Sequence, residues 1–112
     1  MKKVLFYLMQ DEKMCAMHAL MNAKQIIENG GEAKIIFEGK SVKLPQILDQ
    51  EGNSLYNKLI ENETIVGVCK ACSKMLEVYE TNKDLGLKFL DDMDGHAGMS
   101  PYIDQGYQVI EF

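Results

Sequence analysis

Two cysteines in the run Cys69-Lys70-Ala71-Cys72 are the residues of this chain best suited to chemistry. The apolar run Thr64–Val68 leads directly into them, and a helical pattern follows. A thiol at such a strand-to-helix junction faces the unpaired N–H groups and the positive end of the next helix, which favour thiolate over thiol. Because the thiolate is both the nucleophile and the metal ligand, this pair indicates sulfur, redox or metal chemistry without choosing among them.

The two thiols have different expected roles. A helix N-terminus lowers the pKa of a thiol toward neutrality, so we expect Cys69 to be the reactive sulfur. Cys72 either resolves a persulfide or sulfenate on Cys69 into a disulfide, or simply faces the core.

Three further side chains are candidates for auxiliary roles. Cys15 lies near the start of an expected helix, with His18 one turn further on the same face. If the first strand lies beside the third, Cys15 lies near Cys69 and relays sulfur or completes a metal site; otherwise it is a small residue on the buried helix face. His96 lies in the glycine-flanked loop 95–98, where it either stabilises a thiolate and shuttles a proton or hydrogen-bonds to the backbone.

A metal site is an alternative use of these side chains. Cys15, Cys69, Cys72 and His96 together make a Cys₃His set suited to zinc or copper. Zinc fingers and ribbons, however, pair one CxxC with a second pair of ligands, which this chain lacks. We therefore expect no metal.

Other patterns give no cofactor site. A phosphate cradle after the first strand needs small residues and free backbone N–H groups, whereas residues 10–13 include two carboxylates, and no GxGxxG motif is present. We therefore expect no nucleotide, flavin or other cofactor. The acidic run Asp91–Asp94 is typical of a solvated loop. A methionine stripe at helical spacing is more typical of a core or oligomer interface than of a copper site; its members are Met9, Met14, Met17 and Met21.

Composition limits the partners and the compartment. The chain has 112 residues, 46% hydrophobic and 26% charged, which predicts one soluble domain over residues 1–112. The net charge of −5 and the lack of a basic patch argue against nucleic acid. No apolar stretch is long enough to span a bilayer. Three cysteines, an odd number without a disulfide framework, favour a reducing compartment, so we expect a cytoplasmic protein without membrane contact.

Strand and helix patterns alternate along the chain. This alternation predicts a three-layer α/β/α fold with a mainly parallel sheet of about five strands, resembling flavodoxin or Rossmann folds. Ligands of such sheets bind beyond the carboxyl ends of the strands, where we expect loops 10–14, 69–72 and 91–99 to gather. The expected strands are Val4–Met9, Ala33–Phe37, Ile65–Val68 and Tyr107–Phe112, and Leu87–Leu90 is either a fourth strand or the end of a turn. The expected helices are Met14–Glu28, Val42–Gln50, Ser54–Glu61, Ala71–Tyr79 and Met99–Gln105.

Four segments resemble the DsrE/TusD-like (DsrEFH-like, YchN-like) superfamily of small sulfur-relay proteins. They are Lys3–Leu8, Val66–Cys72, Leu90–His96 and Gly106–Ile110, so the similarity extends over nearly the whole chain. In the relay members, a cysteine at the end of strand three carries a persulfide, and Cys69 matches that position. Cys72 is not part of their pattern. The resemblance also implies a trimeric or hexameric assembly.

Two functions remain open. In the first, the protein is a persulfide sulfur carrier or thiol-based sulfur transferase that takes sulfur from a donor protein onto Cys69 and passes it to an acceptor protein, with Cys72 or Cys15 resolving it. In the second, it is a non-enzymatic binding, regulatory or redox-sensing oligomer whose cysteines are structural or sense oxidation. Single-turnover sulfur transfer separates the two.

Overall fold

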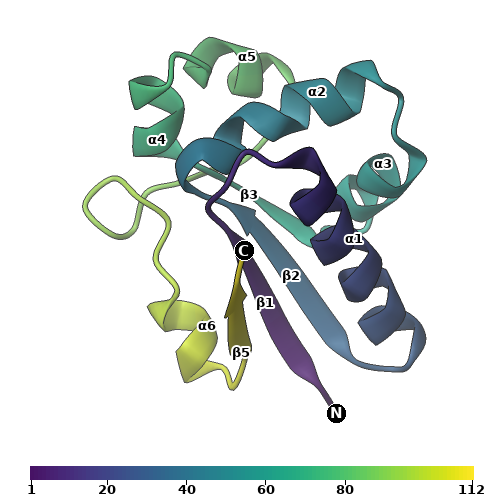
Figure 1. Cartoon of the computed structure of the whole chain (residues 1–112). Coiled ribbons are helices and arrows are strands. Elements are labelled where there is room, and N and C mark those ends of the chain that lie inside the picture. The colour runs from purple at the N-terminus through teal and green to yellow at the C-terminus, as the bar shows by residue number, and fades with distance from the viewer.

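The computed structural model describes all 112 residues, Met1–Phe112, and contains one five-stranded sheet (Figure 1). All strand pairings are parallel, and the strand order is β4-β3-β2-β1-β5. The carboxyl ends of β2 and β3 are therefore neighbours. The strands are β1 (Lys3–Leu8), β2 (Glu32–Phe37), β3 (Ile65–Cys69), β4 (Phe89–Leu90) and β5 (Gln108–Glu111).

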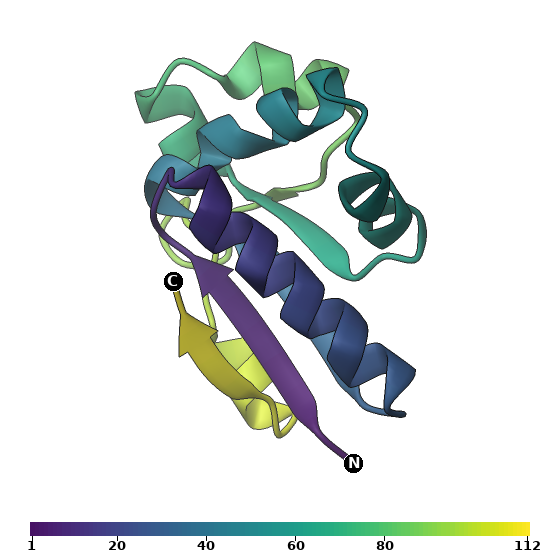
Figure 2. The same ribbon diagram turned by 45° about the vertical axis from the view of Figure 1, so that its right-hand side comes forward.

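Helices lie on both faces of this sheet. Helices α1, α2 and α3 lie over one face, with α5 beside α2, and α6 lies on the opposite face next to β5 (Figures 1 and 2). The predicted three-layer α/β/α fold with a parallel five-stranded sheet is confirmed. The helices are α1 (Lys13–Glu28), the 3₁₀ helix η1 (Gly39–Lys43), α2 (Leu44–Gln50), α3 (Ser54–Glu61), α4 (Lys70–Met75), α5 (Tyr79–Asp84) and α6 (Ser100–Asp104).

The core forms where β1 and β2 meet α1. Val4–Leu8 of β1 and Ile35–Phe37 of β2 are apolar and buried, because helices and neighbouring chain cover both faces of the sheet there. The buried face of α1 carries three alanines and one leucine, and such small residues let the helix lie close to the strands. These four residues are Ala16, Ala19, Leu20 and Ala23.

The helix expected over Ala71–Tyr79 is wrong at its end, because α4 stops four residues earlier and a separate helix, α5, begins at Tyr79. Helix α4 ends at Met75, and Glu77 takes a left-handed φ of 61°. The N–H of Val78 then donates to the carbonyl of Ser73 at 2.8 Å, which closes the helix in the manner of a Schellman motif. Val78 becomes buried by this turn, being 7% exposed, so packing favours the break over a continuous helix.

Gly67 lets β3 approach the chain that leads into β4. A Cβ at this position would collide with the carbonyl oxygen of Lys88. That same oxygen accepts the N–H of Val68 at 2.9 Å. The glycine therefore permits β3 to pair with β4 at Val68 and Cys69, the last two residues of β3.

No helix in the structure combines the length and apolar character that crossing a bilayer requires.

Candidate functional site

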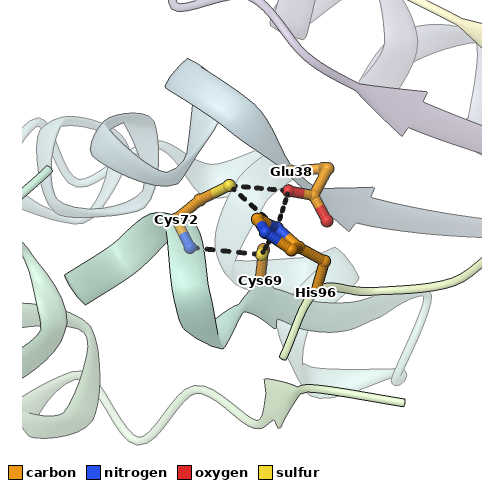
Figure 3. Close-up of side chains that lie close together, drawn as sticks. All are labelled: Glu38, Cys69, Cys72 and His96. Atoms are coloured by element: carbon orange, nitrogen blue, oxygen red, sulfur yellow. Dashed lines mark hydrogen bonds and ion pairs between the residues drawn. The ribbon is translucent and has the colours of Figure 1, made fainter. Parts of the chain in front are cut away.

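Four side chains gather at the carboxyl edge of the sheet: Glu38, Cys69, Cys72 and His96 (Figure 3). Glu38 directly follows β2, Cys69 ends β3, Cys72 lies in the first turn of α4, and His96 lies in the loop after β4. One oxygen, two sulfurs and one nitrogen of these residues all lie within 4.8 Å of one another. The site therefore draws on three strand ends that are far apart in the sequence.

Cys69 is the N-cap residue of α4. Its Sγ accepts the backbone N–H of Cys72 at 3.3 Å, which satisfies one of the free donors at the helix start. The hydroxyl of Ser73 donates to the Cys69 carbonyl at 2.7 Å and fixes the turn from the other side. Cys69 is 0% exposed, whereas Cys72 is only half-buried. Cys72 is therefore the sulfur nearer to solvent.

The His96 imidazole lies against both sulfurs. Its Nδ1 is 3.2 Å from the Sγ of Cys69 and 3.4 Å from the Sγ of Cys72. A tight turn holds the ring there, because His96 and Met93 exchange backbone hydrogen bonds of 2.8 and 2.9 Å. Gly95 anchors this loop to α4 by accepting the N–H of Ala71 at 2.9 Å. The side chain of His96 keeps 36% of its surface exposed, so the imidazole contacts both the sulfurs and solvent.

Glu38 is a buried carboxylate with partners on both oxygens. Its Oε1 accepts the N–H of Gly39 at 2.9 Å and the thiol of Cys72 at 2.8 Å. Its Oε2 accepts the N–H of Ala97 at 3.0 Å, with the Tyr7 hydroxyl at 3.4 Å. Glu38 is 3% exposed, and this network satisfies a charge that would otherwise be costly to bury.

Tyr7 supports the same loop from β1. Its hydroxyl donates to the carbonyl of Ala97 at 2.7 Å. Burial, followed by the neighbouring Glu38 carboxylate, raises the pKa of Tyr7, so the hydroxyl remains a donor. Tyr7 and Glu38 thus hold both backbone groups of Ala97, the residue that follows His96.

The pKa values of the site run opposite to the expectation for a helix N-terminus. Burial, followed by the hydrogen bond to Glu38, raises the pKa of both Cys69 and Cys72. The N–H of Cys72 lowers the pKa of Cys69, but burial and the carboxylate outweigh it. The expected activation of Cys69 by α4 is therefore wrong for the resting site, where both thiols are protonated at neutral pH.

The same hydrogen bonds act on Glu38 in the opposite direction. Burial alone would raise its pKa, but the thiols of Cys72 and Cys69 and the N–H groups of Gly39 and Ala97 together lower it. The resting site therefore combines a charged carboxylate with two neutral thiols.

Sequence reasoning placed three of its candidates correctly in one cluster and misplaced two. Cys69, Cys72 and His96 converge, but Cys15 and His18 are exposed on α1. The expected neighbourhood of Cys15 and Cys69 required β1 beside β3, whereas β2 lies between them. The alternative of a buried Cys15 is also wrong, because the buried face of α1 carries other residues.

Two smaller expectations also need correction. Loop 10–14 after β1 gives no side chain to the cluster, because β2 is the neighbour of β3 and its end supplies Glu38 instead. The methionine stripe is a core face only in part, since Met9 and Met17 pack against the core whereas Met14 is 71% and Met21 46% exposed.

Glu38 is the residue of the cluster that sequence reasoning missed. The signal available was its position, a carboxylate directly after the apolar run Ile35–Phe37 at the edge where ligands bind. With Glu38 in place, the site offers two thiols, an imidazole and a carboxylate in contact. This set can carry out thiol exchange with a nearby proton acceptor or hold a thiophilic metal ion.

Comparison with known proteins identifies relatives in archaea. No protein-family model matches the chain, and no solved structure matches it. An uncharacterized protein of Archaeoglobus fulgidus is 41% identical over 44 residues, which cover 39% of this chain and 72% of that protein. The uncharacterized protein MJ0733 of Methanocaldococcus jannaschii is 37% identical over 95 residues, which cover 85% of this chain and 78% of that protein. At this identity and coverage, the chain belongs to the same protein family as MJ0733.

Proposed function

We propose that this protein is a DsrE-like persulfide carrier of the cytoplasm, acting as a sulfurtransferase through Cys69. The observation that carries the proposal is the shared contact of both sulfurs with one imidazole, at 3.2 Å for Cys69 and 3.4 Å for Cys72. A thiol becomes a nucleophile when a neighbouring base accepts its proton. His96 is in place to do this for either thiol.

Loading begins on a donor protein that carries a persulfide. His96 Nδ1 takes the proton of the Cys69 thiol, and the resulting thiolate attacks the outer sulfur of the donor persulfide. The sulfur–sulfur bond of the donor breaks, and a new one forms on Cys69. The donor leaves as a thiolate that recovers the proton from His96. The products are Cys69 persulfide and donor thiol, with no net oxidation. The Glu38 carboxylate, 3.5 Å from Nδ1, stabilises the imidazolium that forms during the exchange.

Release follows one of two routes. A thiolate of the acceptor protein attacks the outer sulfur of the Cys69 persulfide, which returns Cys69 to the thiol. Alternatively, Cys72 attacks the inner sulfur, which gives a Cys69–Cys72 disulfide and hydrogen sulfide. His96 Nδ1, 3.4 Å from the Sγ of Cys72, takes the Cys72 proton and passes it to the departing sulfide.

The burial of Cys69 favours a sulfur carrier that reacts with protein partners over an enzyme that acts on freely diffusing small molecules. Cys69 is 0% exposed and its sulfur contacts Cys72 and the partly exposed His96, so we expect the donor and acceptor proteins to engage the loop that carries His96. The same burial slows the attack of small thiols on a bound persulfide, so a large excess of thiol is needed to remove it. We also propose that the chain assembles as a homotrimer or homohexamer, as its likeness to the sulfur-relay superfamily implies.

Intact-mass analysis after incubation with polysulfide tests the proposal. The wild-type protein and the matched control Cys15→Ser are expected to gain the mass of one sulfur atom, and reduction with a thiol is expected to remove it. Cys69→Ser is expected to gain none. Loading that persists in Cys69→Ser, or that is lost in Cys15→Ser, contradicts the assignment. Oxidation to a Cys69–Cys72 disulfide without any sulfur uptake would favour a redox sensor instead.

A further inference from the structure

The four side chains of the site also form a donor set with the spacing of a metal centre. We propose that Glu38, Cys69, Cys72 and His96 bind one zinc ion in the reduced protein, through Oε1, the two Sγ atoms and Nδ1. This goes beyond the proposed sulfur transfer and does not rest on it. It replaces the Cys₃His set considered from the sequence, because Glu38 takes the place of the distant Cys15.

Three of the six distances between donor atoms are close to those of a tetrahedral ion, and all six are at most 4.8 Å. Zinc–ligand bonds of about 2.0 to 2.3 Å place neighbouring donor atoms about 3.3 to 3.8 Å apart. Nδ1 of His96 is 3.2 and 3.4 Å from the two sulfurs and 3.5 Å from Oε1 of Glu38. The separation of 2.8 Å between Cys72 Sγ and Glu38 Oε1 is shorter because, without a metal ion, the Cys72 thiol donates a hydrogen bond to this oxygen. When zinc binds, both thiols lose their protons to solvent, and the ion replaces that hydrogen bond.

The surroundings hold the ligands in position. Oε2 of Glu38 is fixed by the N–H of Ala97 at 3.0 Å, which leaves Oε1 to point at the sulfurs. Cys69 Sγ accepts the N–H of Cys72 at 3.3 Å, a contact that stabilises a thiolate ligand without occupying its metal-binding lone pair. Outer partners of this kind orient ligands and raise metal affinity.

The donor types select zinc among the common ions. Calcium and magnesium take oxygen ligands, so two sulfurs exclude them. Iron–sulfur clusters of the common types need four cysteines, and the cluster offers two. Copper(I) prefers soft sulfur donors and binds a carboxylate oxygen weakly. Zinc accepts thiolate, imidazole and carboxylate together in tetrahedral geometry. Zinc binding and persulfide formation both use the sulfur of Cys69, so the zinc-bound protein cannot accept sulfur from a donor.

Thiol counting on the wild-type protein tests the site without any variant. The full chain is reduced, freed of metal with a chelator and titrated with zinc, and its thiols are then alkylated and mapped. We expect one zinc per chain, with Cys69 and Cys72 protected and Cys15 still labelled. Failure to bind one equivalent, or binding that leaves Cys69 and Cys72 as reactive as before, overturns the proposal.

Cobalt(II) identifies the ligands. One equivalent is expected to give the thiolate-to-cobalt charge-transfer band and the intense visible bands of tetrahedral coordination. Cys72→Ser is expected to weaken the charge-transfer band and to lower zinc affinity by at least about 100-fold, and Glu38→Gln by at least about 10-fold. The matched controls Cys15→Ser, His18→Asn and Glu61→Gln lie outside the site and should bind like wild type. Weak, octahedral-type bands in the wild-type protein would overturn the assignment. These readouts involve no persulfide, so failure here leaves the sulfur-carrier proposal standing.

Discussion

Replacement of Glu38 by glutamine is the most informative single change in the site. The substitution keeps the size of the side chain and exchanges one acceptor oxygen for an NH₂ donor. Oε1 faces the N–H of Gly39 and Oε2 faces the N–H of Ala97. In either amide orientation, therefore, one backbone N–H loses its acceptor and faces another donor.

The cost follows from the burial of these groups. A hydrogen bond to a charged acceptor contributes about 1.5 to 3 kcal/mol, and a stranded buried donor costs about 1 to 3 kcal/mol. The glutamine no longer buries a charge, which offsets part of the loss. The lowered pKa of Glu38 indicates that its hydrogen bonds outweigh this burial penalty. We therefore expect Glu38→Gln to lower the free energy of unfolding by about 2 kcal/mol.

Urea denaturation of the reduced, metal-free protein measures this effect. With a slope of about 2 kcal/mol per molar urea, the midpoint should fall by about 1 M at unchanged slope. The matched control Glu61→Gln changes an exposed residue at the end of α3 and should stay within about 0.5 kcal/mol of wild type.

Thiol reactivity provides a second readout of the same variant. The Glu38 carboxylate raises the pKa of Cys72, so its removal should increase the thiolate fraction and speed alkylation of Cys72 near neutral pH. A Glu38→Gln protein with the stability of wild type and slower alkylation would refute this description. Glu38 would then be an accessible base, not a buried anchor.

Three further predictions concern pH, oxidation and assembly. The free energy of unfolding should stay level between about pH 5 and 8. It should decrease in acid, below the ordinary pKa of Glu38, because protonation of this carboxylate weakens its hydrogen bonds in the folded protein. It should also decrease above about pH 8.5, because the thiols of Cys69 and Cys72 lose their protons there only in the unfolded chain. The alkaline slope should approach about 1.4 kcal/mol per pH unit for each thiol, and urea midpoints of Cys72→Ser across pH should show roughly half of it. Mild oxidant should form a reversible Cys69–Cys72 disulfide with Cys15 left free; a peptide map showing both site thiols free would exclude Cys72 as the resolving thiol. Light scattering at micromolar concentration should give three or six times the chain mass of 12.7 kDa, and a stable monomer there would contradict the proposed assembly.

The central strands β1 and β3 could be predicted because burial leaves continuous apolar runs, and α1 because apolar residues recur at helical spacing. The expected helix over Ser54–Glu61 has the same bounds in the structure, where the side chain of Asn53 caps it by accepting the N–H of Tyr56 at 2.9 Å. The break between α4 and α5 was not predictable, because it depends on the burial of Val78 against distant residues.

The site was only partly predictable, since its geometry depends on strand order. The expected convergence of Cys69, Cys72 and His96 needed only the rule that strand ends share one edge. The position of Cys15 needed the pairing of β1, β2 and β3, which no local pattern encodes. Glu38 was missed because a charged residue after a strand is usually exposed. The thiol pKa was misjudged because the helix N-terminus acts locally, whereas burial and Glu38 come from the rest of the fold.

The location of transferred sulfur tests the central claim most directly. A persulfide donor labelled with a heavy sulfur isotope is mixed with the metal-free protein for a single turnover, and the persulfide is trapped by alkylation. Trypsin cleaves after Lys70, so Cys69 and Cys72 appear in separate peptides, and Cys15 in a third. We predict the heavy sulfur on the Cys69 peptide, with loss of the label when an acceptor thiol is added. Heavy sulfur on Cys15 or Cys72 with none on Cys69 would contradict the account.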